Sequence, residues 1–189
     1  MRIGGILLCG GASTRFGSDK LLAGQVPIAV CAAGNLRAVV DSVLAVIPRN
    51  RATLRARLEA CGCEILESDR TQRGMGGSLS AAVGTWPLLD GWIVALGDMP
   101  QVDRATIKAV VDALERGATV AAPYGPDGQR GHPVGFSSKL RDELIALDGD
   151  VGARMVVMRH SSAIVRIETA DPGIFVDVDT PADLARLST

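Results

Sequence analysis

The fold is decided near the start of the chain, where residues 2–20 read RIGGILLCGGASTRFGSDK. The first part, Arg2–Cys9, is short and apolar and leads into glycines, which predicts a buried first strand. In the second part, Gly10–Lys20, glycines let successive backbone N–H groups form a nest for phosphate oxygens. Arg15 and Lys20 add the positive charge that a triphosphate needs and a structural turn does not. The loop has neither the Gly-Lys-Ser/Thr end of a Walker P-loop nor the Gly-x-Gly-x-x-Gly dinucleotide fingerprint, which excludes both of those sites.

Strand and helix patterns alternate along the rest of the chain. Strands are expected at residues 2–9, 42–47, 63–67, 91–96, 119–122, 163–167 and 174–178, with a short apolar run at 134–136. Helices are expected at residues 27–40, 51–60, 103–116, 152–160 and from a cap at Ser137 or Ser138 to residue 147, and two more begin near Ser78 and at Thr180. This alternation predicts a single α/β domain over residues 1–189, with a mostly parallel sheet and helices on both faces. In such sheets, ligands bind beyond the carboxyl ends of the strands.

Composition excludes several classes of protein. The 189 residues carry a net charge of −1 and include only three Phe, two Trp and one Tyr, which argues against a nucleic-acid surface. No apolar run approaches the roughly 18 residues of a membrane span, so we expect a cytoplasmic protein with no membrane partner. Cys61 and Cys63 are too close together for a zinc pair, and structural thiols are expected instead.

Two acidic motifs follow expected strands. Asp98 in Gly97-Asp-Met-Pro100 comes directly after the strand at 91–96, and a carboxylate there can hold magnesium against phosphate oxygens. Asp177 and Asp179 lie two residues apart, so on a strand both carboxylates can point the same way and repel each other unless a cation or a proton intervenes. One of them can instead cap the following helix. Thr180 is a good cap for the last helix, which leaves Asp179 freer to bind a metal.

Together these residues resemble the molybdenum cofactor nucleotidyltransferases, which attach GMP or CMP to molybdopterin. Residues 8–20 match that family's Leu-x-x-Gly-x-Ser-x-Arg-x-Gly-x-x-Lys signature at every fixed position, and residues 97–100 and 179–181 match in order and spacing. The resemblance implies a Rossmann-like three-layer sandwich with a twisted sheet, of the nucleotide-diphospho-sugar transferase type. It also implies an NTP-binding part at about residues 1–100 and an acceptor-binding part at about residues 101–189.

The resemblance implies a role for each matching residue. The catalytic residues would be Arg15, Lys20 and Asp98, with Lys20 neutralising charge around the α-phosphate. The metal would be Mg²⁺, held by Asp98 and by Asp179, with Asp177 as another candidate. The residues expected to bind the nucleotide are Leu8, Gly10, Gly11, Ser13, Gly17, Gly77, Ser78 and Leu79. Arg130 and His132 would contact the acceptor, although His132 can also be read as a loop histidine braced by prolines.

The choice of nucleotide depends on three further segments. Residues 73–80 (RGMGGSLS), 129–134 (QRGHPV) and 149–154 (GDVGAR) resemble the cytidylyltransferase branch of the family. The Gly-Pro-Leu segment of the guanylyltransferase branch is absent. We therefore expect CTP to be preferred over GTP.

The expected reaction is in-line attack by an acceptor phosphate oxygen on the α-phosphorus of CTP, with release of pyrophosphate. It needs charge neutralisation and alignment and no protein nucleophile. Because Lys20 is expected on a solvent-facing loop, its replacement by alanine should reduce turnover far more than it alters folding. The resemblance implies a phosphorylated pterin as acceptor and a transient molybdoenzyme or chaperone as protein partner. Alternatives are a sugar phosphate or methylerythritol phosphate as acceptor, a regulatory nucleotide-binding module without turnover, and a nicotinamide-dependent oxidoreductase.

Overall fold

The protein is built around one seven-stranded sheet with the strand order β3-β2-β1-β4-β6-β5-β7. The computed structural model describes residues 1–10, 16–17, 19–150 and 152–187. The strands are β1 (Ile3–Leu8), β2 (Val43–Ile47), β3 (Glu64–Glu67), β4 (Gly91–Leu96), β5 (Val120–Tyr124), β6 (Val134–Ser137) and β7 (Ile164–Glu168). All neighbouring pairs are parallel except the two that involve β6, which runs antiparallel to β4 and β5. The prediction of a mostly parallel sheet is therefore confirmed.

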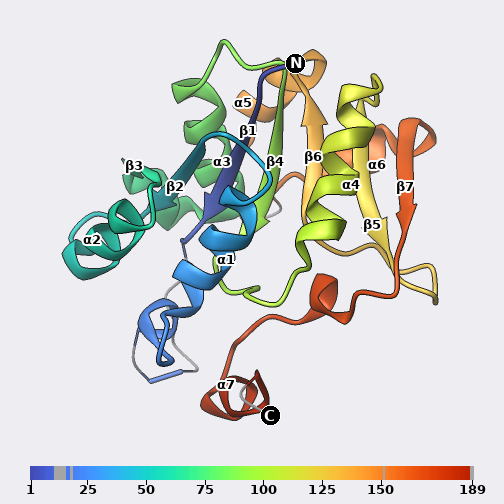
Figure 1. Cartoon of the computed structure of the whole chain (residues 1–189). Helices are drawn as coiled ribbons and strands as arrows, with labels where there is room; N and C mark the ends of the chain where they lie inside the picture. Colours follow the sequence, from blue (N-terminus) through green and yellow to red (C-terminus); the bar gives the residue numbers. More distant parts are fainter. Residues whose placement is uncertain (11–15, 18, 151, 188–189) are drawn as a thin grey trace.

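Helices cover both faces of the sheet (Figure 1). They are α1 (Ile28–Arg37), α2 (Ala52–Ala60), α3 (Gly74–Thr85), α4 (Arg104–Glu115), α5 (Arg141–Ile145), α6 (Arg154–Arg159) and α7 (Pro181–Leu187). Side chains alternate across each strand, so Leu7 of β1 packs in a core with α1, α2 and α4, whereas Ile6 packs in a second core with α3, α5 and α6. Strand β2 is buried along its whole length because it is covered on both faces. Among the described residues, no helix is both long enough and apolar enough to span a bilayer.

The strand expected at residues 174–178 is not formed, and that prediction was wrong. Pro172–Phe175 is a short 3₁₀ helix, and the chain then runs extended without pairing to the sheet. The buried carboxylate of Asp171 fixes this turn, because it accepts hydrogen bonds from the Gly173 N–H at 2.8 Å and from the Thr106 hydroxyl at 2.8 Å. Ile174 and Val178 of this segment are nevertheless buried in the core, which explains why its apolar pattern suggested a strand.

Helix α3 begins at Gly74, four residues before the cap predicted at Ser78. The first turn of α3 is satisfied by a distant loop, since the Gly76 N–H donates to the Gly149 carbonyl at 2.9 Å. Ser78 lies inside the helix, and its hydroxyl donates to the carbonyl of Gly74 at 3.2 Å. The sequence near Gly74 has no capping side chain, because the hydrogen-bond acceptor for this helix start comes from a loop 75 residues away in the sequence (149 − 74).

Candidate active site

The candidate active site lies at the carboxyl edge of the sheet, where β1 and β4 end side by side. Leu8 and Leu96 are register partners, so the segments that leave the two strands start next to each other. Gly97 is required at this point because a Cβ there would lie 2.7 Å from the sulfur of Cys9. The turn after β4 can therefore stay close to β1 and hold Asp98 over the sheet edge.

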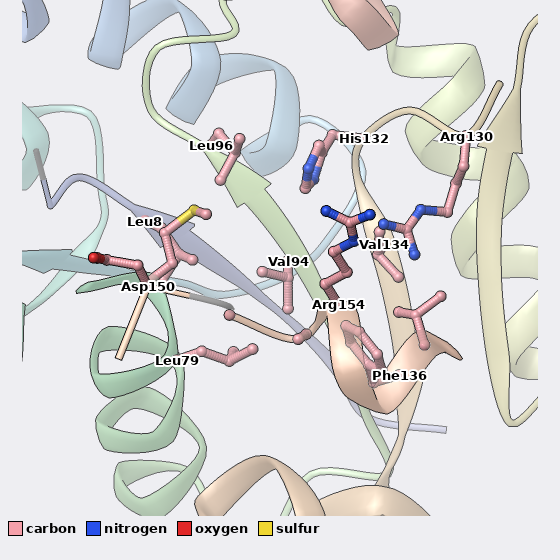
Figure 2. Close-up of a pocket in the computed structure, with 14 residues that line it drawn as sticks. Leu8, Leu79, Val94, Leu96, Arg130, His132, Val134, Phe136, Asp150 and Arg154 are labelled. Atoms are coloured by element: carbon pink, nitrogen blue, oxygen red, sulfur yellow. The ribbon is translucent and has the colours of Figure 1, made fainter. Parts of the chain in front are cut away.

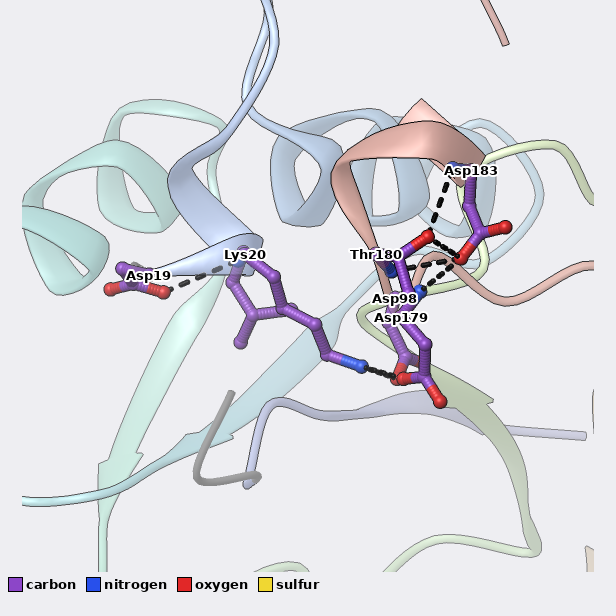
Figure 3. Close-up of polar contacts among 7 residues, drawn as sticks. Asp19, Lys20, Asp98, Asp179, Thr180 and Asp183 are labelled. Carbon is purple, nitrogen blue, oxygen red and sulfur yellow. Dashed lines mark hydrogen bonds and ion pairs between the residues drawn. The ribbon is translucent and has the colours of Figure 1, made fainter. Parts of the chain in front are cut away.

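Lys20 joins two acidic residues that are far apart in the sequence. Its Nζ lies 2.8 Å from Asp98 Oδ2 and 2.7 Å from Asp179 Oδ1 (Figure 3). Burial alone would lower the pKa of Lys20, but the hydrogen bonds to Asp179 and Asp98 outweigh it and raise the pKa above the ordinary lysine value. The ammonium group is therefore charged at neutral pH and neutralises part of the acidic cluster.

The expectation that Lys20 lies on a solvent-facing loop was wrong. Lys20 begins a short 3₁₀ helix, Lys20–Leu22, and is only 8% exposed. Asp19 caps this turn by accepting a hydrogen bond from the Leu21 N–H, and the Leu21 side chain is anchored in the core. The lysine is thus held in place by packing as well as by its ion pairs.

Three carboxylates meet beside Lys20. One oxygen atom from each of Asp98, Asp177 and Asp179 lies within 4.8 Å of the others. The Val178 N–H donates to the Asp98 carbonyl at 2.9 Å, so the segment between the two later aspartates is tied directly to the turn that holds Asp98. Oxygen atoms in such a group could hold a hard divalent cation, which would offset the repulsion between like charges that the Lys20 ammonium offsets only in part.

The start of helix α7 fixes the backbone of Asp179. The Asp183 carboxylate accepts hydrogen bonds from the Thr180 N–H at 2.8 Å and the Asp179 N–H at 3.2 Å, and the Thr180 hydroxyl accepts one from the Asp183 N–H at 3.3 Å. Hydrogen bonds from Thr180 lower the pKa of Asp183 below its ordinary value. The predicted helix start at Thr180 is confirmed, and this reciprocal cap holds Asp179 against Lys20.

Next to this cluster, a cavity of about 440 Å³ opens over β1, β4 and β6 (Figure 2). Leu8, Leu79, Arg130 and His132, all singled out from the sequence, line this cavity. A second hollow of about 450 Å³ is lined by Gly10, Thr71 and Gly74 among others. Met75 and Asp150 line both, so the two hollows adjoin.

Close backbone contact at the start of α3 shapes the boundary between the hollows. Gly74 has a positive φ of 85°, and a Cβ there would lie 2.7 Å from the Cα of Asp150. A Cβ on Gly76 would lie 2.8 Å from the carbonyl oxygen of Asp148. Only glycines allow the loop at 148–150 to dock here, so this loop and the start of α3, noted separately in the sequence, form one structural unit.

Some predicted nucleotide-binding residues do not line either hollow. Gly77 and Ser78 are buried within α3 and line neither of them. Gly17 is exposed and adopts a positive φ of 75°. Gly11, Ser13 and Arg15 lie outside the described residues, so their predicted roles stay predictions.

Among the residues that line the hollows, Met75, Asp150 and Arg154 were not assigned to a site from the sequence. Asp150 and Arg154 belong to a segment quoted for its resemblance to the cytidylyl branch, and that resemblance was the available signal. The resemblance did not indicate that Asp150 and Arg154 line the cavity, because their position depends on how this loop docks against α3.

His132 lies on the cavity wall with a nitrogen atom that has no hydrogen-bond partner among the described residues. This atom is the buried Nδ1. Burial lowers the pKa of His132 to about 4, and the positive charge of Arg130 contributes to the shift, whereas the nearby carboxylate of Asp98 opposes it. The ring is neutral at pH 7 and therefore available for hydrogen bonding without adding charge.

The lowered pKa of His132 predicts a specific acid instability. Between pH 6.5 and about 4 the unfolded chain binds a proton at this ring that the folded chain does not, so the free energy of unfolding falls as the pH falls. Over this pH range the full pKa shift lowers the free energy of unfolding by about 3 kcal/mol. We expect a His132→Gln variant to lose less stability than the wild type across this pH window. Chemical denaturation at several pH values measures the difference, and equal slopes for the two proteins would contradict the prediction.

Several solved structures share the fold of this protein. Rv0371c from Mycobacterium tuberculosis H37Rv is 28% identical, with a TM-score of 0.82 over 99% of this chain and 97% of that one. A structure of Rv0371c in complex with manganese gives a TM-score of 0.77 at 26% identity, over 99% of this chain and 98% of that one. CMP:2-keto-3-deoxy-manno-octonic acid synthetase, complexed with CTP, gives a TM-score of 0.78 at 14% identity, over 99% of this chain and 97% of that one. At this identity the likeness shows a shared fold alone. The predicted Rossmann-like fold of the nucleotide-diphospho-sugar transferase type is confirmed.

The family itself is shown by the sequence. Residues 5–164 match the family model described as the MobA-like NTP transferase domain. This match spans most of the chain, so the protein belongs to the MobA-like NTP transferases, as the sequence motifs predicted. No curated protein matches the chain. Family and fold together support nucleotidyltransferase activity.

Proposed function

We propose that the protein transfers CMP from CTP to the phosphate of a molybdopterin acceptor and releases pyrophosphate. The observation that carries this proposal is the cluster of Lys20, Asp98 and Asp179 at the carboxyl edge of the sheet, beside two adjoining hollows. A transferase needs room for two substrates next to one charged centre, and this arrangement supplies it.

The preference for CTP rests on three segments that meet at the hollows. Gly74 and Met75 come from residues 73–80, Asp150 and Arg154 from residues 149–154, and Arg130 and His132 from residues 129–134. Each of these segments resembles the cytidylyl branch. We assign the nucleotide to the hollow at Gly10 and Thr71 and the acceptor to the cavity at Arg130 and His132. Leu8 and Leu79, from the first half of the chain, also line the acceptor cavity.

Asp98 and Asp179 would hold a magnesium ion, with Asp177 close enough to join them. When bound, the metal neutralises charge on the triphosphate oxygens and favours departure of pyrophosphate. Manganese in the Rv0371c complex supports a divalent cation in this role. The carboxylates fit a metal in geometry and chemistry, and the ammonium of Lys20 already lies where positive charge is required.

Lys20 would turn from the carboxylates to the α-phosphate when substrate is present. An oxygen of the acceptor phosphate forms a bond to the α-phosphorus, and the bond from the α-phosphorus to the bridging oxygen breaks, with its electron pair leaving on pyrophosphate. No proton has to be removed because the acceptor phosphate is already ionised. We further propose that the enzyme acts in the cytoplasm and hands its product to a molybdoenzyme or a chaperone.

The nucleotide assignment is tested with CTP, GTP, ATP and UTP, each with and without magnesium. We expect CTP with magnesium to raise the melting temperature most, since a ligand at 100 times its Kd stabilises the folded state by about 2.7 kcal/mol. Pyrophosphate release with a phosphorylated pterin should follow the same order. Equal responses to CTP and GTP, or a GTP preference, would overturn the cytidylyl assignment. Nucleotide binding without pyrophosphate release on any phosphorylated acceptor would indicate a regulatory module instead.

A further inference from the structure

One arginine on the wall of the nucleotide hollow is tied to the turn that carries Lys20. Arg51 lines this hollow beside Gly10 and Pro48. Its Nη2 atom lies 2.5 Å from Oδ1 of Asp19, the residue immediately before Lys20. The two side chains are only 23% and 27% exposed, so their charges attract each other in a partly dehydrated setting. The ion pair therefore connects the nucleotide hollow to the turn of Lys20.

The backbone brings Arg51 to this position by a sharp turn after β2. β2 lies next to β1 in the sheet, so the segments that follow the two strands start side by side. Asn50 has a positive φ of 63°, a conformation that asparagine adopts more readily than most other residues. Helix α2 starts directly afterwards, and the Arg51 carbonyl accepts a hydrogen bond from the Arg55 N–H at 2.9 Å. Arg51 is thus fixed at the carboxyl edge of the sheet, next to the end of β1.

Two neighbouring arginines make ordinary surface contacts instead. Arg49 pairs with Asp69 and Arg55 pairs with Glu59, but the side chains in these pairs are 46% to 65% exposed. Exposed pairs of this kind contribute little to stability, because water screens both charges. Arg51 differs from both neighbours in its burial and in having a partner beside Lys20.

Asp19 transmits the position of Arg51 to Lys20. The same Oδ1 atom that faces Arg51 accepts a hydrogen bond from the Leu21 N–H at 3.2 Å and so caps the 3₁₀ turn. Figure 3 shows Asp19 on one side of this turn and the Lys20 side chain leaving the other side toward Asp98. Without Arg51 the partly buried carboxylate would lose its cation, and its rotation into water would become favourable at the expense of the cap.

Cys9, the first residue after β1, lies within electrostatic reach of both the ion pair and the acidic cluster. Burial raises the pKa of its thiol, the negative charge of Asp98 raises it further, and the positive charge of Arg51 opposes this shift. Charges that act on one thiol lie within a short distance of it. The Arg51–Asp19 pair and the acidic cluster therefore lie around the same strand end.

We propose that Arg51 is a positioning residue: through Asp19 it holds the turn that sets Lys20 against Asp98 and Asp179. This inference rests on the proposed function, in which Lys20 acts on the α-phosphate. The contact lacks the alignment of a hydrogen bond, and the buried Nη2 atom donates none to any described residue, so the attraction of charges holds the pair. Arg51→Lys should therefore keep the positioning role, whereas Arg51→Met should lose it.

Acylation with acetic anhydride reports the position of Lys20 without any substrate. The chain has three lysines, and the exposed Lys108 and Lys139 serve as internal references. Lys20 is buried and ion-paired, so in the wild type it should react more slowly than either. We expect Arg51→Met to raise the acylation rate of Lys20, relative to Lys139, by about 10-fold. Mass spectrometry of the peptides measures the three rates.

Matched variants show whether Arg51 acts through Asp19. Asp19→Asn retains an oxygen atom for the cap but no charge, so it alone should raise the acylation of Lys20, whereas Arg51→Lys should not. In the Asp19→Asn background, Arg51→Met should change the rate by less than about twofold, because its partner is already gone. Arg55→Met, on the same helix but in an exposed pair, is the matched control and should leave the rate unchanged. Melting temperatures verify folding, and if Arg51→Met unfolds, Asp19→Asn and Arg51→Lys still test the ion pair.

The kinetic constants separate positioning from direct binding of the nucleotide. With CTP, magnesium and a phosphorylated acceptor, Arg51→Met should lower kcat by about 10- to 100-fold and leave the KM for CTP nearly unchanged. A direct contact between Arg51 and the nucleotide would instead raise KM, in the Asp19→Asn background as well, and that result would overturn the proposal.

Equal acylation of Lys20 in the wild type and Arg51→Met would also overturn the proposal, as would an equal increase in Arg55→Met. The proposed function fails separately. If no NTP yields pyrophosphate while the acylation of Lys20 still depends on Arg51 and Asp19, the positioning role stands without that reaction. If CTP is turned over while acylation and kcat are unaffected by Arg51→Met, only the positioning role is wrong.

Discussion

Replacing Asp98 by asparagine is expected to reduce magnesium-dependent pyrophosphate release by about 10²- to 10³-fold, while the protein stays folded. Asparagine keeps the size of the side chain and can still accept a hydrogen bond from Lys20, but it removes one of the three carboxylates that meet at this point. Metal affinity should fall, because a neutral amide oxygen binds a divalent cation much more weakly than a carboxylate does. Initial rates at saturating CTP, with magnesium varied, measure both effects.

The same substitution at the other two aspartates identifies the second metal ligand. Asp179 contacts Lys20, whereas Asp177 is exposed and lies within reach of the metal without touching the lysine. We expect Asp179→Asn to match Asp98→Asn and Asp177→Asn to have a smaller effect. Asp112→Asn, which changes an exposed carboxylate on α4 that pairs with Lys108, is the control for charge alone. Near-normal magnesium-dependent turnover in both Asp98→Asn and Asp179→Asn would remove the metal site from the mechanism.

The sequence was sufficient to predict the strands that form the sheet, because most of them are short apolar runs bounded by glycines or prolines, but it also predicted one strand that does not form. β1, β2 and β4 were predicted closely, since each is buried on both faces and shows no competing pattern. The meeting of Asp98 and Asp179 was also predicted, but for a partly wrong reason. Asp179 does not follow a strand; it is delivered by an unpaired segment that Val178 ties to Asp98.

What could not be predicted depends on contacts between distant segments. The burial of Lys20 follows from the packing of Leu21 and from two carboxylates contributed by residues 78 and 159 positions away. The position of Arg154 on the cavity wall follows from the docking of residues 148–150 against the glycines of α3. Neither arrangement could be predicted from a local sequence pattern. The periodicity of apolar residues shows which face of a helix or strand is buried, but it does not show which distant segment packs against that face.

The burial of Lys20 changes what its removal should do. Lys20→Met keeps the length and apolar part of the side chain but leaves the carboxylates of Asp98 and Asp179 facing each other without the ammonium group. We expect turnover to fall by about 10²- to 10³-fold, because the charge at the α-phosphate is lost. Without metal, the free energy of unfolding should also fall by about 1–3 kcal/mol, because the lysine's partners are left unpaired.

The discriminating result is the response of Lys20→Met to metal in the absence of nucleotide. In the wild type a cation must compete with the ammonium group for Asp98 and Asp179, since one nitrogen atom contacts both carboxylates. In the variant that competitor is gone, so Mn²⁺ should bind more tightly and should restore most of the lost stability. Titration of the Mn²⁺ electron paramagnetic resonance signal and melting curves with and without the ion measure the two effects. Lys108→Met, which removes an exposed lysine paired with Asp112, should change neither. If Lys20→Met binds Mn²⁺ no better than the wild type, Lys20 and the metal do not share these carboxylates, and the lysine would have to act on the triphosphate from a separate position.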